Sequence, residues 1–367
     1  MRLPRKSPDF IIFLVTILLL SIGVIMVFSA SAVKAGINYN DEYYFLKRQL
    51  LWSVIGILAM ISMMNIDYYR LKRFAGSILL IGLFCLVLVL VPGVGKGAKG
   101  AIRWVGIGPL TFQPSEVMKL CLVFFMAKSL SNYQDRIQSF VGGVLPHLAI
   151  VGVVAGLVML QPDLGTAVTI CGTTFLLLFA AGARTSHLVF LALMGIALVA
   201  VASVTASYRM ERWIAFLDPW KYALDEGFQT IQSLYAIGSG GLLGMGLGRS
   251  RQKLFYLPEQ HTDFIFAILG EELGFIGAVL VVALFFLFAW RGLRVAITCP
   301  DSFGSLLATG ITCMISLQAI INIGVVSGSL PVTGITLPFL SYGGSSLLFT
   351  MIGVGILLNI SRYTTAK

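Results

Sequence analysis

The residues best suited to chemistry gather where a polar segment runs directly into a long apolar stretch. The segment Phe255–Gly274 reads FYLPEQHTDFIFAILGEELG and places Asp263 beside His261 and Thr262 at the expected boundary of a membrane. A carboxylate at such a boundary is partly desolvated, which makes it a better proton acceptor, whereas the start of the following helix favours its charged form. The sequence leaves that balance open, and Asp263 is the first candidate for a general base. His261 and Thr262 beside it are candidate substrate-binding residues.

Two further acidic residues, Glu271 and Glu272, follow about two helical turns deeper. On a continuous helix with about 100° per residue, Glu271 lies roughly 80° round from Asp263, and Glu272 lies on the opposite side. Both cannot serve one site with Asp263. We therefore expect at least one of them to be structural and paired with a Lys or Arg of another helix.

A second polar motif, Gln113–Lys119, reads QPSEVMK at the start of another apolar stretch. Pro114 suits the first turn of a helix, and Ser115 can cap it. Glu116 and Lys119 are three residues apart and so share one helix face, close enough to pair. The pair has two open interpretations: a structural ion pair, or a polar floor beneath the charged group of a substrate.

A similar phrase, QPDLG, recurs at Gln161–Gly165. Its Asp163 can cap the next helix, which alone would explain the residue. The same carboxylate could instead hold a cation or a sugar hydroxyl, so Asp163 is a candidate substrate-binding residue.

Basic side chains accompany these acidic clusters. Arg103, Arg249 and Lys253 are candidate substrate-binding residues, because arginine in particular suits bidentate contact with phosphate. Arg209, Arg212 and Arg251 could act in the same way. Any single one of them could equally be a contact with lipid headgroups or a solvated charge.

The elements that must position these residues are membrane helices. The chain has 367 residues, of which 57% are hydrophobic and only 11% are charged, compared with about 25% charged residues in globular proteins. Its net charge of +10 indicates membrane topology and contact with lipid headgroups rather than nucleic-acid binding.

The apolar stretches predict an all-α polytopic protein with ten transmembrane helices, forming one integral membrane domain over residues 1–367. A crossing needs about 20 apolar residues. The expected spans are 10–32, 50–66, 76–93, 115–131, 140–160, 165–183, 187–206, 263–290, 303–329 and 343–361.

The distribution of Lys and Arg predicts the orientation. The side that holds both termini collects thirteen basic residues, and the short loops opposite hold six, so we expect both termini in the cytoplasm. This places residues 207–262 in a large extracytoplasmic loop between the seventh and eighth helices. Within it, Phe228–Ala236 predicts a short amphipathic helix, and a glycine-dense run follows.

Taken together, the motifs resemble the shape, elongation, division and sporulation (SEDS) family, the FtsW/RodA/SpoVE proteins, across essentially the whole chain. Features such as Ser29–Val33 and Gln252–Tyr256 are most similar to the sporulation branch, and the division branch comes next. The phrases that carry the resemblance are Phe112–Glu116, Gln161–Gly165, Leu257–Phe264, Glu271–Gly274, Asn322–Gly324 and Gly334–Ser345.

The resemblance implies a peptidoglycan glycosyltransferase of the bacterial cytoplasmic membrane. Such enzymes polymerise lipid II on the outer face of the membrane beside a class B penicillin-binding protein, and their essential acidic residue maps onto Asp263. Arg103 and loop cations, with a divalent cation such as Mg²⁺ or Mn²⁺, could stabilise the departing undecaprenyl diphosphate.

Two other functions remain open from the sequence. Ten helices with buried charges and many glycines also describe a transporter or a lipid II flippase, although transporter sites usually lie at the bilayer midplane rather than at its outer boundary. A non-catalytic scaffold that recruits a penicillin-binding protein is the other alternative.

Overall fold

Ten helices of the structure coincide with the ten expected spans. The computed structural model describes residues 6–98, 101–107, 110–205 and 207–364. In these ranges, eight helices are long and apolar enough to cross a membrane, with α5 counted together with the π-helical turn Phe140–Val144 that leads into it. The helix α6 is shorter, and α4 carries charged residues. The ten are α1 (Phe10–Tyr39), α2 (Tyr44–Asn65), α3 (Tyr68–Leu90), α4 (Pro114–Asn132), α5 (Leu145–Met159), α6 (Leu164–Ala180), α7 (Thr185–Val204), α10 (Ile265–Thr298), α11 (Ser302–Val326) and α12 (Gly344–Ser361). The chain is therefore a polytopic membrane protein.

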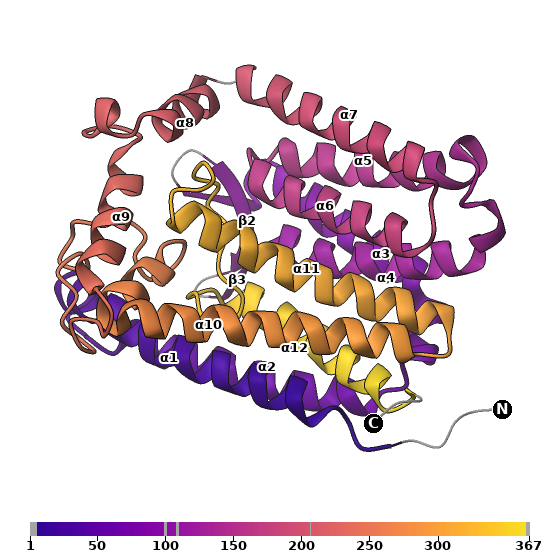
Figure 1. Cartoon of the computed structure of the whole chain (residues 1–367), viewed down its shortest axis with the longest axis horizontal. Helices are drawn as coiled ribbons and strands as arrows, with labels where there is room; N and C mark the ends of the chain where they lie inside the picture. Colours follow the sequence, from indigo (N-terminus) through magenta and orange to yellow (C-terminus); the bar gives the residue numbers. More distant parts are fainter. Residues whose placement is uncertain (1–5, 99–100, 108–109, 206, 365–367) are drawn as a thin grey trace.

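The long helices run side by side along one axis (Figure 1). The first and last of them start and finish at the same end, because the backbone N–H of Lys6 donates to the Arg362 carbonyl at 2.9 Å and that of Asp9 donates to the Ser361 hydroxyl at 2.9 Å. An even number of crossings requires this arrangement.

The opposite end of the bundle carries the segment between α7 and α10 (Figure 1). It contains α8 (Ser207–Leu217), a short 3₁₀ turn (Trp220–Tyr222) and α9 (Phe228–Gly240). The predicted helix over Phe228–Ala236 is confirmed as the first part of α9, whereas α8 was not predicted as a separate helix. Gly240 brings α9 so close to α10 that a Cβ there would clash with the Gly270 carbonyl.

A small antiparallel sheet, which the all-α prediction did not include, lies between α3 and α4. Its strands are β1 (Gly95–Ala98), β2 (Ala101–Ile107) and β3 (Leu110–Phe112), in the order β1–β2–β3. Strands of four, seven and three residues are too short to show a clear alternating pattern. The sheet matters here because β2 carries Arg103.

Close packing of α2 against α12 shows how small residues assemble the bundle. A Cβ on Gly355 would clash with the Met60 carbonyl, and one on Gly344 would clash with the Trp52 ring. Small residues allow membrane helices to approach where lipid supplies no hydrophobic driving force. As a result α11 and α12 are mostly buried, whereas α7 lies at the periphery.

Candidate active site

Asp263 lies in a tight turn just before α10, one residue ahead of the helix cap Phe264. Glu259 has a φ of 53°, and its carbonyl accepts hydrogen bonds from the backbone N–H groups of Thr262 at 3.1 Å and Phe264 at 3.2 Å. The turn therefore holds Asp263 at the positive end of the α10 helix dipole.

Asn322 of α11 joins Asp263 to the α11–α12 loop, residues 327–343. Its side-chain amide donates to the carbonyl of Asp263 at 2.8 Å and to that of Ile335 at 2.6 Å. Gly334 has a φ of 75°, and a Cβ on it would lie 3.6 Å from Oδ2 of Asp263. The half-buried carboxylate thus lies against the backbone of a loop from another part of the chain.

His261 and Thr262 hold the same turn from its other side. The His261 ring is buried, 4.6 Å from the Phe45 ring and 5.7 Å from the Tyr342 ring. Their carbonyls accept hydrogen bonds from the α11–α12 loop: that of His261 from the Tyr342 N–H at 2.9 Å, and that of Thr262 from the Ser341 hydroxyl at 2.6 Å. Both residues position the turn, and their contact with a substrate stays a prediction.

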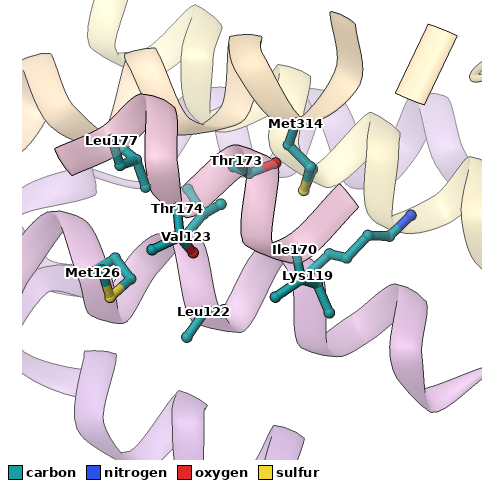
Figure 2. A pocket seen from close by; sticks show the side chains of 9 residues that line it. All are labelled: Lys119, Leu122, Val123, Met126, Ile170, Thr173, Thr174, Leu177 and Met314. Carbon is teal, nitrogen blue, oxygen red and sulfur yellow. The ribbon is translucent and has the colours of Figure 1, made fainter. Parts of the chain in front are cut away.

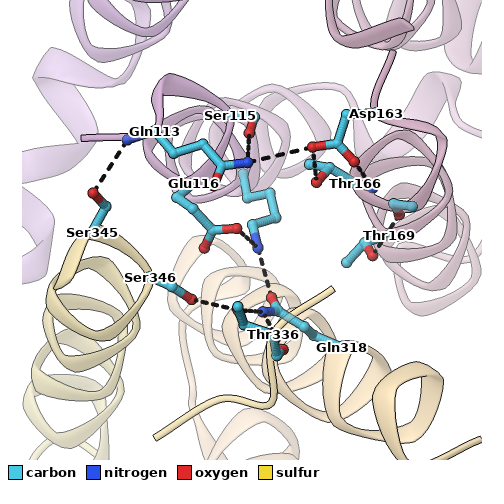
Figure 3. Close-up of polar contacts among 12 residues, drawn as sticks. Gln113, Ser115, Glu116, Asp163, Thr166, Thr169, Gln318, Thr336, Ser345 and Ser346 are labelled. Atoms are coloured by element: carbon cyan, nitrogen blue, oxygen red, sulfur yellow. Dashed lines mark hydrogen bonds and ion pairs between the residues drawn. The ribbon is translucent and has the colours of Figure 1, made fainter. Parts of the chain in front are cut away.

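Glu116 and Lys119 form the expected ion pair, with 2.8 Å between Oε1 and Nζ. Both side chains are buried, and Lys119 also donates to Oε1 of Gln318 at 2.6 Å. Gln318 in turn donates to the carbonyl of Thr336 in the α11–α12 loop at 3.0 Å. Figure 3 shows this chain of polar contacts linking α4, α11 and the loop. The predicted pairing is confirmed, and both the structural interpretation and the role as substrate floor stay predictions.

Ser115 does not cap α4, contrary to the sequence prediction. Because Pro114 occupies the first turn, the cap position falls on Gln113, whose side chain makes no capping bond. Ser115 lies inside the helix and accepts a hydrogen bond from Nε2 of Gln113 at 3.0 Å.

Asp163 caps α6, as one of its two interpretations proposed. Its Oδ1 accepts from the N–H of Thr166 at 3.1 Å, and its Oδ2 accepts from the Thr166 hydroxyl at 2.9 Å. Oδ2 also lies 3.4 Å from Nε2 of Gln113 and 3.9 Å from a guanidinium nitrogen of Arg103. Arg103 donates to the carbonyls of Gln161, at 3.1 Å, and Pro162. The starts of α4 and α6 are therefore joined beside the small sheet.

Glu271 and Glu272 are both buried, and both bind the segment Ser250–Lys253. Glu271 accepts from the Ser250 hydroxyl and from the N–H of Arg251 at 2.9 Å. Glu272 pairs with Lys253 at 3.0 Å. The structural role expected for at least one of them is confirmed, but the lysine comes from a loop rather than from another helix.

The helical-wheel argument for these two glutamates does not apply, because Asp263 precedes the helix. The helix is also broken just after Glu272, at Gly274, whose φ is 67° and ψ −167°.

Lys253 and Arg249 are both predicted to contact the substrate, but the structure buries the first and exposes the second. Lys253 is 6% exposed and committed to Glu272, so a substrate could reach it only if that pair opened. Arg249 is exposed to solvent. Both contacts stay predictions.

A small cavity between α4, α6 and α11 is not large enough for a substrate. It has a volume of about 10 Å³ and is lined by Lys119, Thr173 and Met314 among others, which is roughly the space of one water molecule. In Figure 2 the Lys119 amine extends away from the other lining side chains.

No metal site is formed by side chains alone in the described part of the chain. Those residues contain no cluster of three or more His, Cys, Asp and Glu side chains able to hold a metal ion. The divalent cation stays a prediction.

The α11–α12 loop is the part of the site that the sequence did not assign. Asn322 and Gly334 lie in phrases that carried the family resemblance, but neither received a role. Gln318 went unnoticed because a single amide in an apolar helix gives no periodic signal. Its partners lie 18 residues away at Thr336 and 199 residues away at Lys119.

Comparison with known proteins agrees with this arrangement. The chain is 52% identical to stage V sporulation protein E of Bacillus subtilis over 364 residues, which cover 99% of this chain and all of that protein. It is 46% identical over 353 residues to a probable peptidoglycan glycosyltransferase FtsW of Geobacter, covering 96% of each.

Solved structures share the fold. The rod shape determining protein RodA of Thermus thermophilus superposes with a TM-score of 0.73 at 30% identity, covering 98% of this chain and 99% of that one. A chain in a peptidoglycan synthase complex that coordinates polymerization and crosslinking superposes with a TM-score of 0.80 at 33% identity, covering 97% and 98%. Residues 9–366 match the family described as cell cycle protein, and the chain belongs to this FtsW/RodA/SpoVE family.

Proposed function

We propose that the protein is a peptidoglycan glycosyltransferase that polymerises lipid II into glycan strands, for spore cortex or septal cell wall. The observation that carries the proposal is the Asp263 turn. In a chain of this family, it holds a half-buried aspartate at the end of the bundle, its backbone fixed by Asn322 and the turn around it by the α11–α12 loop. An aspartate on a fixed backbone suits a general base, because proton transfer needs a defined geometry.

In the proposed reaction, Asp263 accepts the proton of the 4-hydroxyl group of the acceptor N-acetylglucosamine. That oxygen forms a bond to C1 of the donor N-acetylmuramic acid, and the bond from C1 to the diphosphate breaks with inversion. Undecaprenyl diphosphate leaves as an anion and needs no proton, so one base is enough, unlike the paired carboxylates of glycosidases. Arginines at this end of the bundle stabilise the departing charge.

A divalent cation, Mg²⁺ or Mn²⁺, is part of the proposal only as an accessory. Oxygens of the lipid diphosphate would supply ligands for it, and the cation would neutralise phosphate charge. The proton transfer to Asp263 does not require it.

The proposal places the protein in the bacterial cytoplasmic membrane, with both termini in the cytoplasm and Asp263 on the outer face. Lipid II presents its sugars on that face, and the apolar grooves between helices would accept its polyprenyl chain. A class B penicillin-binding protein is the proposed partner, and the similarity to a chain in a peptidoglycan synthase complex supports it.

The test is polymerisation of purified lipid II by the purified protein with its partner. Asp263→Asn and Asp263→Ala should lower the rate by roughly 10²-fold or more, as expected for removal of a general base, without a change in thermal stability. Asp301→Asn is the matched control, because Asp301 caps α11 and asparagine caps equally well.

Other outcomes favour the rival functions. Equal strand synthesis by the wild type and both Asp263 variants would remove Asp263 as the base. No strands from any protein, with the partner and a divalent cation present, would favour a lipid II flippase or a scaffold.

A further inference from the structure

Two buried amides on one face of α11 hold consecutive residues of the α11–α12 loop. Gln318 and Asn322 lie four residues apart, so their side chains share a face of the helix. Asn322 donates to the Ile335 carbonyl at 2.6 Å, and Gln318 donates to the Thr336 carbonyl at 3.0 Å. Asn322 also donates to the Asp263 carbonyl at 2.8 Å. The two amides therefore hold the loop and the Asp263 turn to the same helix.

The part of the loop held in this way lies directly beside the Asp263 carboxylate. Gly334 comes just before the two held residues, and a Cβ on it would lie 3.6 Å from Oδ2 of Asp263. Farther along the loop, the Ser341 hydroxyl donates to the Thr262 carbonyl at 2.6 Å and accepts from the Leu337 N–H at 2.7 Å. A shift of the loop would therefore move both the surroundings of the carboxylate and the turn that carries it.

Lys119 fixes the direction in which the Gln318 amide points. The Lys119 ammonium can only donate, and it donates to Oε1 of Gln318 at 2.6 Å. The Thr336 carbonyl can only accept, so it needs the NH2 group of the same amide. The reversed amide would set donor against donor on one side and acceptor against acceptor on the other. Glu116 holds the ammonium at 2.8 Å, so the ion pair orients Gln318 toward the loop (Figure 3).

Directional bonds suit this task better than apolar contacts would. Apolar packing is non-directional, and a loop held by it alone can slide along a helix. The Gln318 side chain is 3% exposed and uses both ends of its amide, since its nitrogen also lies 3.4 Å from the Thr336 hydroxyl. A buried polar group that is satisfied in this way rigidifies its surroundings. Misplacement of reacting groups by about 1 Å can cost roughly 10²-fold in rate, so the position of this loop bears on the reaction.

We propose that Gln318 is a positioning residue. Oriented by Lys119, it fixes the α11–α12 loop against the Asp263 turn and so holds the general base in its reactive geometry. The inference rests on the proposed function and adds to it a residue of a different helix. It also gives the Glu116–Lys119 pair a task that requires no contact with the substrate.

The first test is the kinetics of strand synthesis from purified lipid II by the full-length protein with its partner. Gln318→Met keeps a similar volume and loses the donor to the loop. It should lower kcat, counted per folded protein, by roughly ten- to hundredfold. The KM for lipid II should stay unchanged, because a buried positioning residue acts on the transition state and not on substrate binding.

Three further variants grade the effect. Gln318→Asn keeps the amide but is one methylene shorter, so it should lose the loop contact too, and it replaces Gln318→Met if that variant does not fold. Thr336→Val keeps the carbonyl bond and loses only the longer hydroxyl contacts, so kcat should fall by no more than about threefold. Thr309→Val is the matched control on α11, because the Thr309 hydroxyl bonds within its own helix, at 2.9 Å to the Ser305 carbonyl, and both constants should stay unchanged.

Hydrogen exchange of the full-length protein in detergent measures the loop without turnover. In Gln318→Met, the backbone amides of Leu337 and Tyr342, which are hydrogen-bonded in the loop, should exchange roughly tenfold faster, as loss of one hydrogen bond allows. The amides of Met245 and Gly246, which are bonded to α10 at its break, should exchange as in the wild type.

Four results would overturn the inference. The first is a wild-type kcat in the folded Gln318 variants. The second is a raised KM with an unchanged kcat, which would indicate contact with the substrate. The third is unchanged exchange in the loop. The fourth is faster exchange at Met245 and Gly246 as well, which would show a general loss of stability.

The two measurements separate this inference from the proposed function. Strand synthesis by the wild type and an equal kcat in Gln318→Met would contradict the positioning role alone. Absence of strands from the wild type, with faster loop exchange in Gln318→Met, would contradict the glycosyltransferase alone.

Discussion

The stretch from Asp263 to the helix break at Gly274 carries carboxylates in two contrasting environments, one at each end. At its start, Asp263 is half-buried, and contacts to its backbone hold it in place. Two turns later, Glu271 and Glu272 are fully buried, and their carboxylates bind Ser29, Ser250, Arg251 and Lys253. Asp263 is fixed through its backbone and stays partly exposed, whereas the Glu271 and Glu272 carboxylates are buried in contacts that serve the fold.

Beside Glu271 and Glu272, the loop after α9 supplies the backbone hydrogen bonds that α10 lacks at its break. The break at Gly274 frees the Glu271 and Glu272 carbonyls, which accept from the N–H groups of Met245 and Gly246, both at 3.0 Å. On the far side of the break, Phe275 and Ile276 donate to the carbonyls of Gly241 and Leu242 at 2.8 and 3.2 Å. The loop thus replaces the missing helical bonds, as buried backbone groups require.

The largest effect should come from the buried ion pair. Glu272→Gln leaves the Lys253 ammonium without its carboxylate and should lower the free energy of unfolding by about 3–5 kcal/mol, measured by denaturant titration in mixed micelles. The double variant Glu272→Gln with Lys253→Met removes both charges and should recover most of that loss. Asp263→Asn should leave stability unchanged, and a loss as large as that of Glu272→Gln would remove the contrast between the two ends.

The second-largest loss of stability should come from a substitution at the helix break, Gly274. Gly274→Ala places a Cβ at a backbone conformation that is essentially restricted to glycine, 2.7 Å from the Leu242 carbonyl, and should cost about 1–3 kcal/mol. Gly195→Ala in α7 is the control, because nothing lies within 4 Å of its Cβ position. A neutral Gly274→Ala would indicate that α10 runs straight through this point without the loop.

Asp163 shares features of both kinds of carboxylate. It caps α6, which is a structural role, and it also approaches Arg103, a candidate substrate-binding residue. Asp163→Ala should lower the unfolding free energy by about 0.5–2 kcal/mol through loss of the cap, whereas Asp163→Asn should retain most of the stability. If Asp163→Asn also retains polymerisation, the residue is structural. A stable but inactive Asp163→Asn would instead place its negative charge in the substrate site.

Apolar stretches predicted the ten helices well, because bilayer thickness sets a minimum length that sequence shows directly. Their ends were predicted less well. The structure starts α2 at Tyr44 rather than at residue 50 and ends α1 at Tyr39 rather than at residue 32. These extra turns contain residues such as Lys47 and Arg48, which hydropathy excludes although the backbone remains helical.

The candidate acids were also predictable, because an ionisable side chain in an apolar helix is costly and therefore noticeable. Their division into roles was not. Whether Glu272 is structural depends on Ser29, which is 243 residues away. Asn322 of α11 and Gly334 of the α11–α12 loop come close to Asp263 only in the folded chain. Local sequence identifies such residues one at a time, and the partners that decide their roles are brought together by the fold.

The smallest effect on stability should come from the exposed ion pair Asp41–Lys47, in contrast to the buried pair Glu272–Lys253. Asp41 accepts a hydrogen bond from Lys47 at 2.8 Å in the connection between α1 and α2, and this bond lowers the pKa of Asp41 below its ordinary value of 3.8. A lowered folded-state pKa stabilises the protein above the ordinary value, and that stabilisation is lost as the pH falls through the lowered pKa.

Asp41→Asn should therefore lower the Tm slightly at neutral pH and by less in strong acid, measured by thermal unfolding in detergent. The effect should also shrink at high salt, because exposed charges are screened. The Tm loss from Glu272→Gln should persist in high salt, because its partner charge is buried. Equal salt dependence of the two variants would show that water reaches the Glu272–Lys253 pair, and the two ends of the first α10 segment would then differ less than their burial indicates.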